Sequence, residues 1–278
     1  MDLLSYLPVV GIVGLILKRA TSTKTIDIKC ITFDLDDTIW QCQPVIERAA
    51  DAFYTYMRAN FPKIVKLYPT KKEWRKLSAQ VTKENPDKKH DLTLIRKICL
   101  KRVAIEANLN PKDVIEPCYK AFIDSRNNIE DYLFPDAISV LERIHKSGIQ
   151  IGAISNGNAA IDNIPILKKY FDFAVNPETA GQKKPDMAPF KQALELSCAT
   201  NSAEILHVGD SLTSDVHPAK LFGCGLTVWV KTGSVWSGTS PTLCTEEQLS
   251  KGTGDVEITS LNELIPALQK LKILPLKF

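Results

Sequence analysis

Four short polar segments contain residue types that can attack an electrophile, transfer a proton or hold an anion. The first, Asp34-Leu35-Asp36-Asp37-Thr38, follows the apolar residues 29–33. Two carboxylates two residues apart, placed just after a strand, can point into one site. One can then attack an electrophile while the other supplies or removes a proton. Acidic turns and calcium loops have similar spacing, so this segment alone leaves both interpretations open.

Two further segments could bind an anionic group. Ser155-Asn156-Gly157 comes after residues 150–154, and a hydroxyl beside backbone N–H groups at a glycine turn can cradle an anion. Lys183-Lys184-Pro185-Asp186 supplies an ammonium group that can neutralise a phosphoryl group and keep a carboxylate ionised. Seen singly, the first is equally a plain turn and the second a solvated surface segment.

The fourth segment is Gly209-Asp210-Ser211-Leu212-Thr213-Ser214-Asp215, which follows residues 205–208. Its carboxylates are the hard oxygen ligands that suit Mg²⁺, an ion that uses few protein carboxylates and keeps several waters. A helix N-cap by Ser214 would explain part of the segment, but not two acids around a glycine turn. The segment therefore favours a metal site.

The elements that must position these segments alternate between strand and helix. Short apolar runs at 29–33, 150–154, 205–208 and 226–230 are typical of buried parallel strands. Together with the helical spacing between them they predict an α/β fold, a Rossmann-like parallel sheet with right-handed crossovers. Because ligands of such sheets bind beyond the carboxyl ends of the strands, we expect the polar segments at one edge.

A helical insertion interrupts this alternation. After Thr38 the spacing is helical for about ninety residues, and Thr70 to Glu73, Asp91 and Asn110-Pro111 predict three helix starts. We therefore expect an α/β catalytic core at 25–43 and 133–278 and a helical cap at 44–132.

Two features are predicted near the end of the chain. A long surface loop is expected around residues 231–254, which are rich in Gly, Ser and Thr. Ser260 to Glu263 predicts a capping box that opens a last helix.

The N-terminal extension, residues 1–24, is apolar from 3 to 17 and then reads Lys18-Arg19. Fifteen apolar residues are fewer than the roughly 20 that span a bilayer, and the signatures of secretory and mitochondrial leaders are absent. Membrane association through 3–17, targeting and a docked helix stay open. The seven scattered cysteines favour an intracellular, cytoplasmic or organellar, location.

Charge distribution narrows the expected partners. From Lys63 to Arg102 there are thirteen Lys or Arg against four Asp or Glu, whereas the net charge of the chain is only +3. This region is either a set of solvated helix faces or a basic surface facing an anionic substrate. Nucleic acid is not expected, because a binding motif and interleaved aromatic residues are missing. The oligomeric state is left open.

In chain order, the four segments resemble the motifs of the haloacid dehalogenase-like hydrolase superfamily, over roughly residues 29–230. The resemblance implies an aspartyl-phosphate mechanism, in which a nucleophile attacks phosphorus and a general acid/base protonates the leaving oxygen and then activates water. It implies that the catalytic residues are Asp34 as nucleophile, Asp36 as general acid/base, and Lys184. The substrate-binding residues that it implies are Ser155, Asn156, Gly157 and Lys184. The implied Mg²⁺ ligands are Asp34, Asp36 (through its main-chain carbonyl), Asp210 and Asp215.

The resemblance also indicates the reaction type. Dehalogenases of the superfamily lack a carboxylate where this chain has Asp36, so a phosphatase is expected, with a phosphomutase as the next candidate. A cap of this kind closes over small molecules, which implies a small-molecule phosphate ester as substrate. A non-catalytic binding or membrane-attached scaffold protein is the alternative of another class.

A narrower resemblance concerns the substrate. Residues 31–44, 90–96, 156–159 and 205–210 resemble a bacterial and plastid-type branch that hydrolyses flavin mononucleotide and 5-amino-6-(5-phospho-D-ribitylamino)uracil. Another sugar phosphate or nucleotide is the alternative. Trp40 would either stack on a flavin ring or pack between core and cap.

Two histidines are assigned more modest roles. His90 either contacts the substrate, faces solvent or caps a helix. His207, inside a predicted strand, is expected to be a buried core histidine with satisfied hydrogen bonds.

Overall fold

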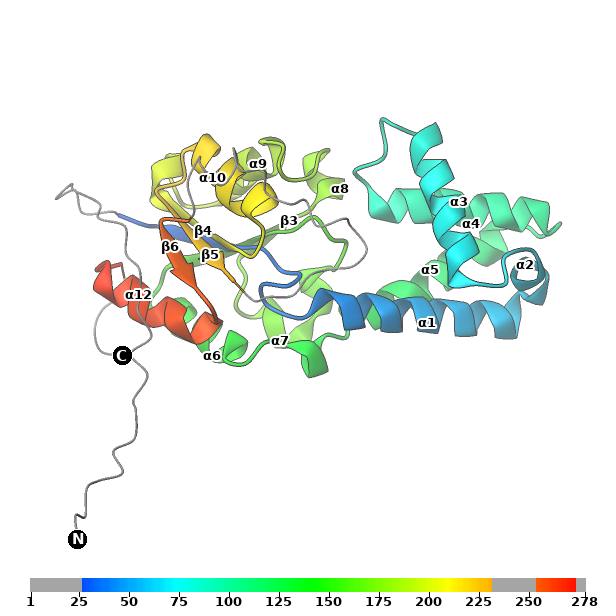
Figure 1. The fold of residues 1–278 in the computed structure, drawn as a ribbon, viewed down its shortest axis with the longest axis horizontal. Coiled ribbons are helices and arrows are strands. Elements are labelled where there is room, and N and C mark those ends of the chain that lie inside the picture. Colours follow the sequence, from blue (N-terminus) through cyan, green and yellow to red (C-terminus); the bar gives the residue numbers. More distant parts are fainter. Residues whose placement is uncertain (1–26, 232–253, 274–278) are drawn as a thin grey trace, which may run out of the picture.

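Six strands form one parallel sheet in the computed structural model, which describes residues 27–231 and 254–273 (Figure 1). Their order is β3-β2-β1-β4-β5-β6. The first strand pairs with β2 on one side and β4 on the other, so the strand order reverses there and creates a switch point for ligand binding. The strands are β1 Cys30–Phe33, β2 Gln150–Ile154, β3 Phe173–Val175, β4 Ile205–Gly209, β5 Leu226–Val230 and β6 Val256–Ile258.

Helices cover both faces of the sheet, which confirms the predicted Rossmann-like α/β fold (Figure 1). One face packs against α6 and α12 in the main hydrophobic cluster, and the other against α9 and α10. Because both faces are buried, the strands appear in the sequence as short apolar runs. These helices and two short ones are α6 Ala137–Lys146, α7 Pro165–Lys168, α8 Pro177–Ala180, α9 Ala188–Leu196, α10 His217–Phe222 and α12 Leu264–Lys270.

Five helices between β1 and β2 pack around a hydrophobic cluster of their own, at the right of Figure 1. Its centre includes Phe53 and Trp74, whose rings meet at 4.8 Å between centroids, and burying one such side chain contributes about 1.5–3 kcal/mol. This separate cluster agrees with the interpretation of residues 44–132 as a cap. The helices are α1 Cys42–Asn60, α2 Pro62–Leu67, α3 Lys71–Glu84, α4 Leu92–Glu106 and α5 Pro111–Asn127.

The predicted starts of the cap helices are confirmed. Thr70 and Glu73 form the capping box of α3, and the Asp91 carboxylate accepts a hydrogen bond of 2.7 Å from Leu94 N at the start of α4. The Asn110 side chain likewise accepts one from Lys112 N before α5.

In the core, a predicted capping box and an N-cap considered as an alternative are not formed. Before the last helix the Glu263 carboxylate bonds Thr259, while Ser260 donates to Asn262 and so makes no capping box. After β4 the cap is Ser211, whose hydroxyl accepts from Ser214 N, so the helical turn Leu212–Val216 begins earlier than expected. In both cases a neighbouring hydroxyl provides a competing local hydrogen bond.

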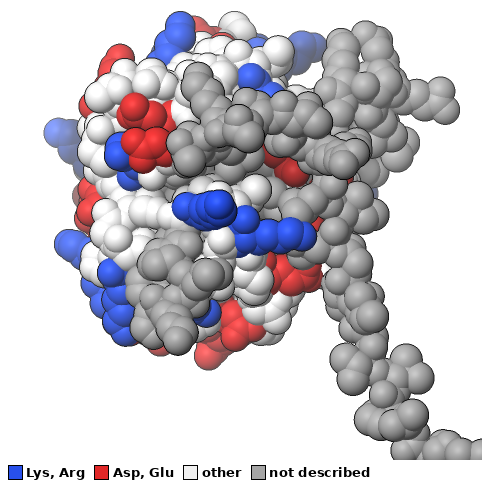
Figure 2. All heavy atoms as spheres, turned by 90° about the vertical axis from the view of Figure 1, so that its left-hand side faces the viewer, with Lys and Arg blue, Asp and Glu red and all other residues white. Residues whose placement is uncertain are grey.

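Several lysines and arginines of the basic region are paired within the cap. Lys71 pairs with Asp51, and Lys97 pairs with Glu116 at 2.9 Å. Figure 2 shows the end of the core remote from the cap, where acidic and basic side chains are interspersed over the described surface. This pairing favours solvated helix faces over a continuous basic surface.

Two expectations fall on residues that the structure does not describe. The apolar segment 3–17 lies outside the described residues, as does nearly all of the loop expected at 231–254. Among the helices of the described ranges, none combines the length and hydropathy that a membrane span requires.

Candidate active site

The loop after β1 turns sharply and places two carboxylates at the switch point. Asp34 N donates to Val208 O at 2.8 Å and so continues the pairing of β1 with β4. Asp37 adopts a left-handed φ of 62°, and its carboxylate accepts from the backbone N–H of Cys42, the first residue of α1. This contact agrees with a structural role for Asp37 at the junction between core and cap.

Lys184 is the buried cation at the centre of the site, with a side chain only 1% exposed. Its Nζ donates to Asp34 Oδ1 at 2.7 Å, to Asp215 Oδ1 at 2.5 Å and to the main-chain carbonyl of Ile154. An ammonium group has three donors, and all three are used. Burial alone would lower the pKa of Lys184, but the charges of Asp215 and Asp34 raise it, so the lysine stays cationic at neutral pH.

The segment after β2 supports this lysine. The side-chain amide of Asn156 donates to Lys184 O at 2.9 Å and accepts from Lys184 N at 2.8 Å. Asn156 thus positions the lysine loop, and a direct contact with substrate stays a prediction. Ser155 Oγ accepts from Gly157 N at 3.0 Å, which leaves its hydroxyl hydrogen able to donate to a bound oxyanion.

Three carboxylates gather beside Lys184. Oxygen atoms of Asp34, Asp210 and Asp215 all lie within 4.8 Å of one another. Thr38 Oγ1 bridges two of them, at 3.3 Å from Asp34 Oδ2 and 3.4 Å from Asp210 Oδ1. The predicted metal ligands on β1 and β4 therefore do meet in space.

The pKa values of these acids diverge. Burial raises the pKa of Asp34 to about 7, against the charge of Lys184, while burial and the charge of Asp34 raise that of Asp210 well above its usual range. Burial would raise that of Asp215 too, but Lys184 and His207 lower it to about 2. With all three acids ionised, one lysine would leave an excess of negative charge, which adds to the effect of burial and makes two of the acids harder to ionise.

A divalent cation fits this donor set. The three hydrogen bonds of Lys184 go to groups other than Asp210, and the hard oxygens of the cluster are the ligands that Mg²⁺ prefers. A cation among them would return Asp34 and Asp210 to the ionised form. The carboxylate of Asp36 accepts hydrogen bonds from Arg126, so Asp36 would contribute its main-chain carbonyl to a metal site.

His207 lies behind the cluster, in β4. Its ring is 1% exposed, with Nδ1 2.9 Å from Thr32 Oγ1 and Nε2 3.4 Å from Asp215 Oδ1. Burial lowers the pKa of His207, and a neutral ring can accept from the threonine while donating to the carboxylate. The expected buried, hydrogen-bonded histidine is confirmed.

Asp36 faces the cap side of the site and belongs to a second cluster. Its Oδ1 accepts from Trp40 Nε1 at 2.9 Å, and both carboxylate oxygens lie 2.6 Å from Arg126 Nη2. Arg126 comes from α5 and is fully buried. Trp40 is also fully buried, so it packs between core and cap and has no exposed ring face for a substrate.

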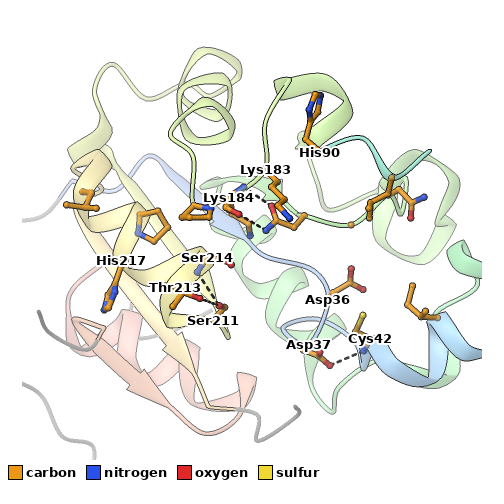
Figure 3. Close-up of a pocket in the computed structure, with 18 of the residues that line it drawn as sticks. Asp36, Asp37, Cys42, His90, Lys183, Lys184, Ser211, Thr213, Ser214 and His217 are labelled. Atoms are coloured by element: carbon orange, nitrogen blue, oxygen red, sulfur yellow. Dashed lines mark hydrogen bonds between the residues drawn. The ribbon is translucent and has the colours of Figure 1, made fainter. Parts of the chain in front are cut away.

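A cavity of about 970 Å³ opens between core and cap (Figure 3). Asp36, Lys183 and Lys184 line it from the core side, and His90 lines it from the segment before α4. Leu92 of the cap and Leu221 of α10 add apolar surface, being 48% and 82% exposed. His90 therefore lies where a substrate would, which leaves substrate contact open for it.

Comparison with known proteins agrees with this geometry. Residues 28–223 match the haloacid dehalogenase-like hydrolase family. The chain belongs to this family. Its enzyme class, a hydrolase with phosphatases among its relatives, is thereby confirmed.

Individual relatives of this haloacid dehalogenase-like hydrolase differ in the activity their names state. The 5-amino-6-(5-phospho-D-ribitylamino)uracil phosphatase YigB of Escherichia coli is 28% identical over 68% of this chain and 78% of its own. The pyrimidine 5'-nucleotidase YjjG of the same species is 35% identical, over 35% of this chain and 44% of its own.

A solved structure extends the likeness to the whole fold. A 2-haloacid dehalogenase from Pseudomonas syringae superposes with a TM-score of 0.73 at 27% identity, covering 87% of this chain and 99% of that one.

Sequence reasoning missed one residue of the site in this haloacid dehalogenase-like hydrolase, Arg126. A signal was present, because the buried residues of α5 recur every four positions at Val114, Cys118, Phe122 and Arg126. A charged residue that continues an apolar stripe needs a buried partner. The pattern of α5 does not identify this partner, which is Asp36, 90 residues away in the sequence.

Proposed function

We propose that this hydrolase is a Mg²⁺-dependent phosphatase of a small phosphomonoester, with Asp34 as nucleophile and Asp36 as general acid/base. One observation carries the choice of a phosphatase: a carboxylate stands two residues after the nucleophile and lines the cavity. A phosphate ester needs a proton on its leaving oxygen, whereas a halide leaves without one. Asp36 therefore favours phosphatase over dehalogenase chemistry, despite the structural likeness to a dehalogenase.

The nucleophile, the general acid/base and a charge-balancing ammonium group of this mechanism are side chains of the chain itself. Asp34 attacks phosphorus and forms an aspartyl-phosphate, while Asp36 protonates the leaving oxygen and then activates water. Lys184 fixes the orientation of Asp34 through the contact of 2.7 Å and offsets its charge. The hydroxyl of Ser155, which accepts from Gly157 N, is proposed to donate to a phosphoryl oxygen.

Mg²⁺ is proposed as the cofactor, held by Asp34, Asp210, the main-chain carbonyl of Asp36 and, through its placement in the same cluster, Asp215. When bound, it would offset the repulsion between a carboxylate nucleophile and an anionic phosphate. At about 4 Å that repulsion is of order 4 kcal/mol at an effective dielectric of 20, so a cation is expected to be required.

The substrate is proposed to be flavin mononucleotide or 5-amino-6-(5-phospho-D-ribitylamino)uracil. The likeness to YigB over most of both chains supports this choice, as does a cavity of about 970 Å³ whose lining joins lysines to apolar residues. A pyrimidine nucleotide is the alternative that the likeness to YjjG supports. Cellular location and membrane association through residues 3–17 stay predictions.

Phosphate release from a substrate panel tests the proposal. The panel holds flavin mononucleotide, the ribitylaminouracil phosphate, pyrimidine nucleotides, sugar phosphates and a generic aryl phosphate, each with Mg²⁺ and with chelator. We expect Mg²⁺-dependent release, abolished in Asp34→Asn, and highest for the first two compounds. Preference for a nucleotide or sugar phosphate would overturn the substrate. Chloride release from a 2-haloacid, or no turnover of any ester, would overturn the phosphatase.

A further inference from the structure

We propose that Arg126, a cap residue, is a positioning residue that holds the general acid/base Asp36 in its proton-transfer orientation. The inference rests on the proposed function and deepens it. On this proposal, the cap helps to protonate the leaving group as well as to enclose the substrate.

The contacts on Asp36 distinguish its two oxygens. Oδ1 accepts from both Trp40 Nε1, at 2.9 Å, and Arg126 Nη2, at 2.6 Å, so its two lone pairs are used. Oδ2 accepts from the same Nη2, at 2.6 Å, and not from Trp40. The arginine and the tryptophan together anchor Oδ1 and leave Oδ2 as the oxygen that can exchange a proton.

Asp36 Oδ2 points to the expected phosphoryl site. A Cβ atom on Gly157 would lie 2.4 Å from Asp36 Oδ2, 3.1 Å from Arg126 Nη2 and 3.3 Å from Ser155 Oγ. Three polar groups thus converge on the backbone of one glycine. Oδ2 lies beside the hydroxyl proposed to hold the phosphoryl group, where a leaving oxygen would need a proton.

Arg126 is placed for this contact rather than for stability. Its side chain is 1% exposed, and its buried Nε and Nη1 have no hydrogen-bond partner among the described residues. A buried cation with unfilled donors is costly, and an apolar side chain would continue the stripe of α5 at lower cost. Those two nitrogens are also enclosed, so they do not face the cavity to bind a substrate.

The backbone around Arg126 is fixed to both parts of the molecule. Arg48 of α1 donates to the carbonyls of Ser125 and Asn128, and the Asn127 side chain accepts from Ala160 N of the core at 3.1 Å. The end of α5 therefore has a defined position relative to the loop after β2. A guanidinium carried there can orient a core carboxylate with little freedom.

The test measures how kcat/KM depends on the leaving group, for a series from nitrophenyl to alkyl phosphates. General acid catalysis matters most for poor leaving groups. Arg126→Met should therefore lower kcat/KM about 10- to 100-fold for alkyl phosphates and less than about 3-fold for nitrophenyl phosphate. Arg126→Lys should recover part of the alkyl rate. The result is read as the slope of a plot of log kcat/KM against the pKa of the leaving group. Because one protein preparation is used for all substrates, partial unfolding lowers every point equally and leaves this slope unchanged.

Lys97→Met is the control, because it removes a cap cation that pairs with Glu116 of α5 and does not contact Asp36. It should leave the slope of wild type, whereas Trp40→Phe, which removes the other donor to Oδ1, should steepen it. An equal loss on every substrate in Arg126→Met, or a change confined to KM, would overturn the proposal. So would failure of Asp36→Asn to steepen the line, which, like an inactive wild type, would overturn the proposed function as well.

Discussion

The deep half of the site and its cap-facing half are built on different principles. In the deep half, Asp34, Lys184 and Asp215 meet because each follows a strand or lies in a loop at the carboxyl edge of one sheet. In the cap-facing half, Asp36 meets Arg126, which comes from a helix of the insertion. Topology alone brings the first set together, whereas the second depends on how the cap is seated.

The two halves also differ in how completely their charges are satisfied. Lys184 uses all three donors, while Arg126 Nε and Nη1 make no hydrogen bond to any residue that the structure describes. A saturated ion network fixes one geometry, whereas the arginine contributes one nitrogen to one carboxylate. On the proposed function, the deep half would serve binding and attack, and the cap-facing half would adjust a single proton transfer.

Asp34→Asn should have the largest effect on activity. The substitution keeps the shape of the nucleophile and removes its ability to attack, so kcat for phosphate release should fall by at least about 10³-fold. Circular dichroism should show a folded protein, since an amide can still accept from Lys184. Residual activity near that of wild type would refute covalent catalysis by Asp34 and, with it, the chemistry assigned to the deep half.

Lys184→Met should produce the largest loss of stability. Removing the ammonium leaves Asp34 and Asp215 facing each other without a cation, and breaking a buried pair in this way costs about 3–5 kcal/mol. Urea unfolding in chelator measures the difference. Lys146→Met is the matched control, because its pair with Glu142 has a side chain 63% exposed and should change stability by no more than about 1 kcal/mol. Equal losses would mean that burial of the ion pair is unimportant.

The sequence was sufficient for the deep half because its residues obey general rules of parallel sheets. The bounds of β2 and β5 match the apolar runs at 150–154 and 226–230, since strands buried on both faces leave an uninterrupted apolar pattern. Lys184 and Asp34 are 150 residues apart, yet the rule for strand ends places both at one edge.

Other parts of the molecule lacked such a rule. β6 was not predicted, because a strand of three residues with Glu257 at its centre is too short to show a period. The contact of Arg126 with Asp36 depends on packing between core and cap, which no local pattern records. The role of Trp40 was not predictable for the same reason, because neighbouring residues in the sequence do not distinguish stacking on a substrate from packing between core and cap.

Gly157→Ala should disturb the cap-facing half selectively. The new methyl group would lie 2.4 Å from Asp36 Oδ2, so the carboxylate must move, and kcat/KM should fall about 10- to 100-fold. Stability should drop by only about 1–3 kcal/mol, the usual cost of overpacking. Gly148→Ala is the control: no atom lies within 4 Å of its Cβ, but its φ of 80° is strained for alanine. It should lower stability and leave kcat/KM unchanged, and the opposite pattern would contradict the assignment of Asp36.

Stabilisation by Mg²⁺ should depend on pH, because the acids of the deep half compete for protons and metal. The folded-state pKa of Asp34 is raised from 3.8 to about 7, and that of Asp210 is raised as well. The stabilising protonation of Asp34 is complete below about pH 4 and is lost as pH rises through about 7, and that of Asp210 is lost in the same direction. The pKa of Asp215 is instead lowered to about 2, so its ionised form stabilises the folded protein. That stabilisation changes with pH only below about pH 4.

Between pH 5.5 and pH 8, therefore, the metal-free protein should lose stability that Mg²⁺ restores at the higher pH. The increase in Tm on adding Mg²⁺ should be about 2–6 °C larger at pH 8 than at pH 5.5, which corresponds to about 1–2 kcal/mol. In Asp210→Asn the increase should be small at both pH values, because one ligand is gone. If wild type gave the same increase at both pH values, Asp34 and Asp210 would not be releasing protons to the metal. The negative charge of the deep half would then be neutralised within the chain, and its difference from the cap-facing half would lie in position alone.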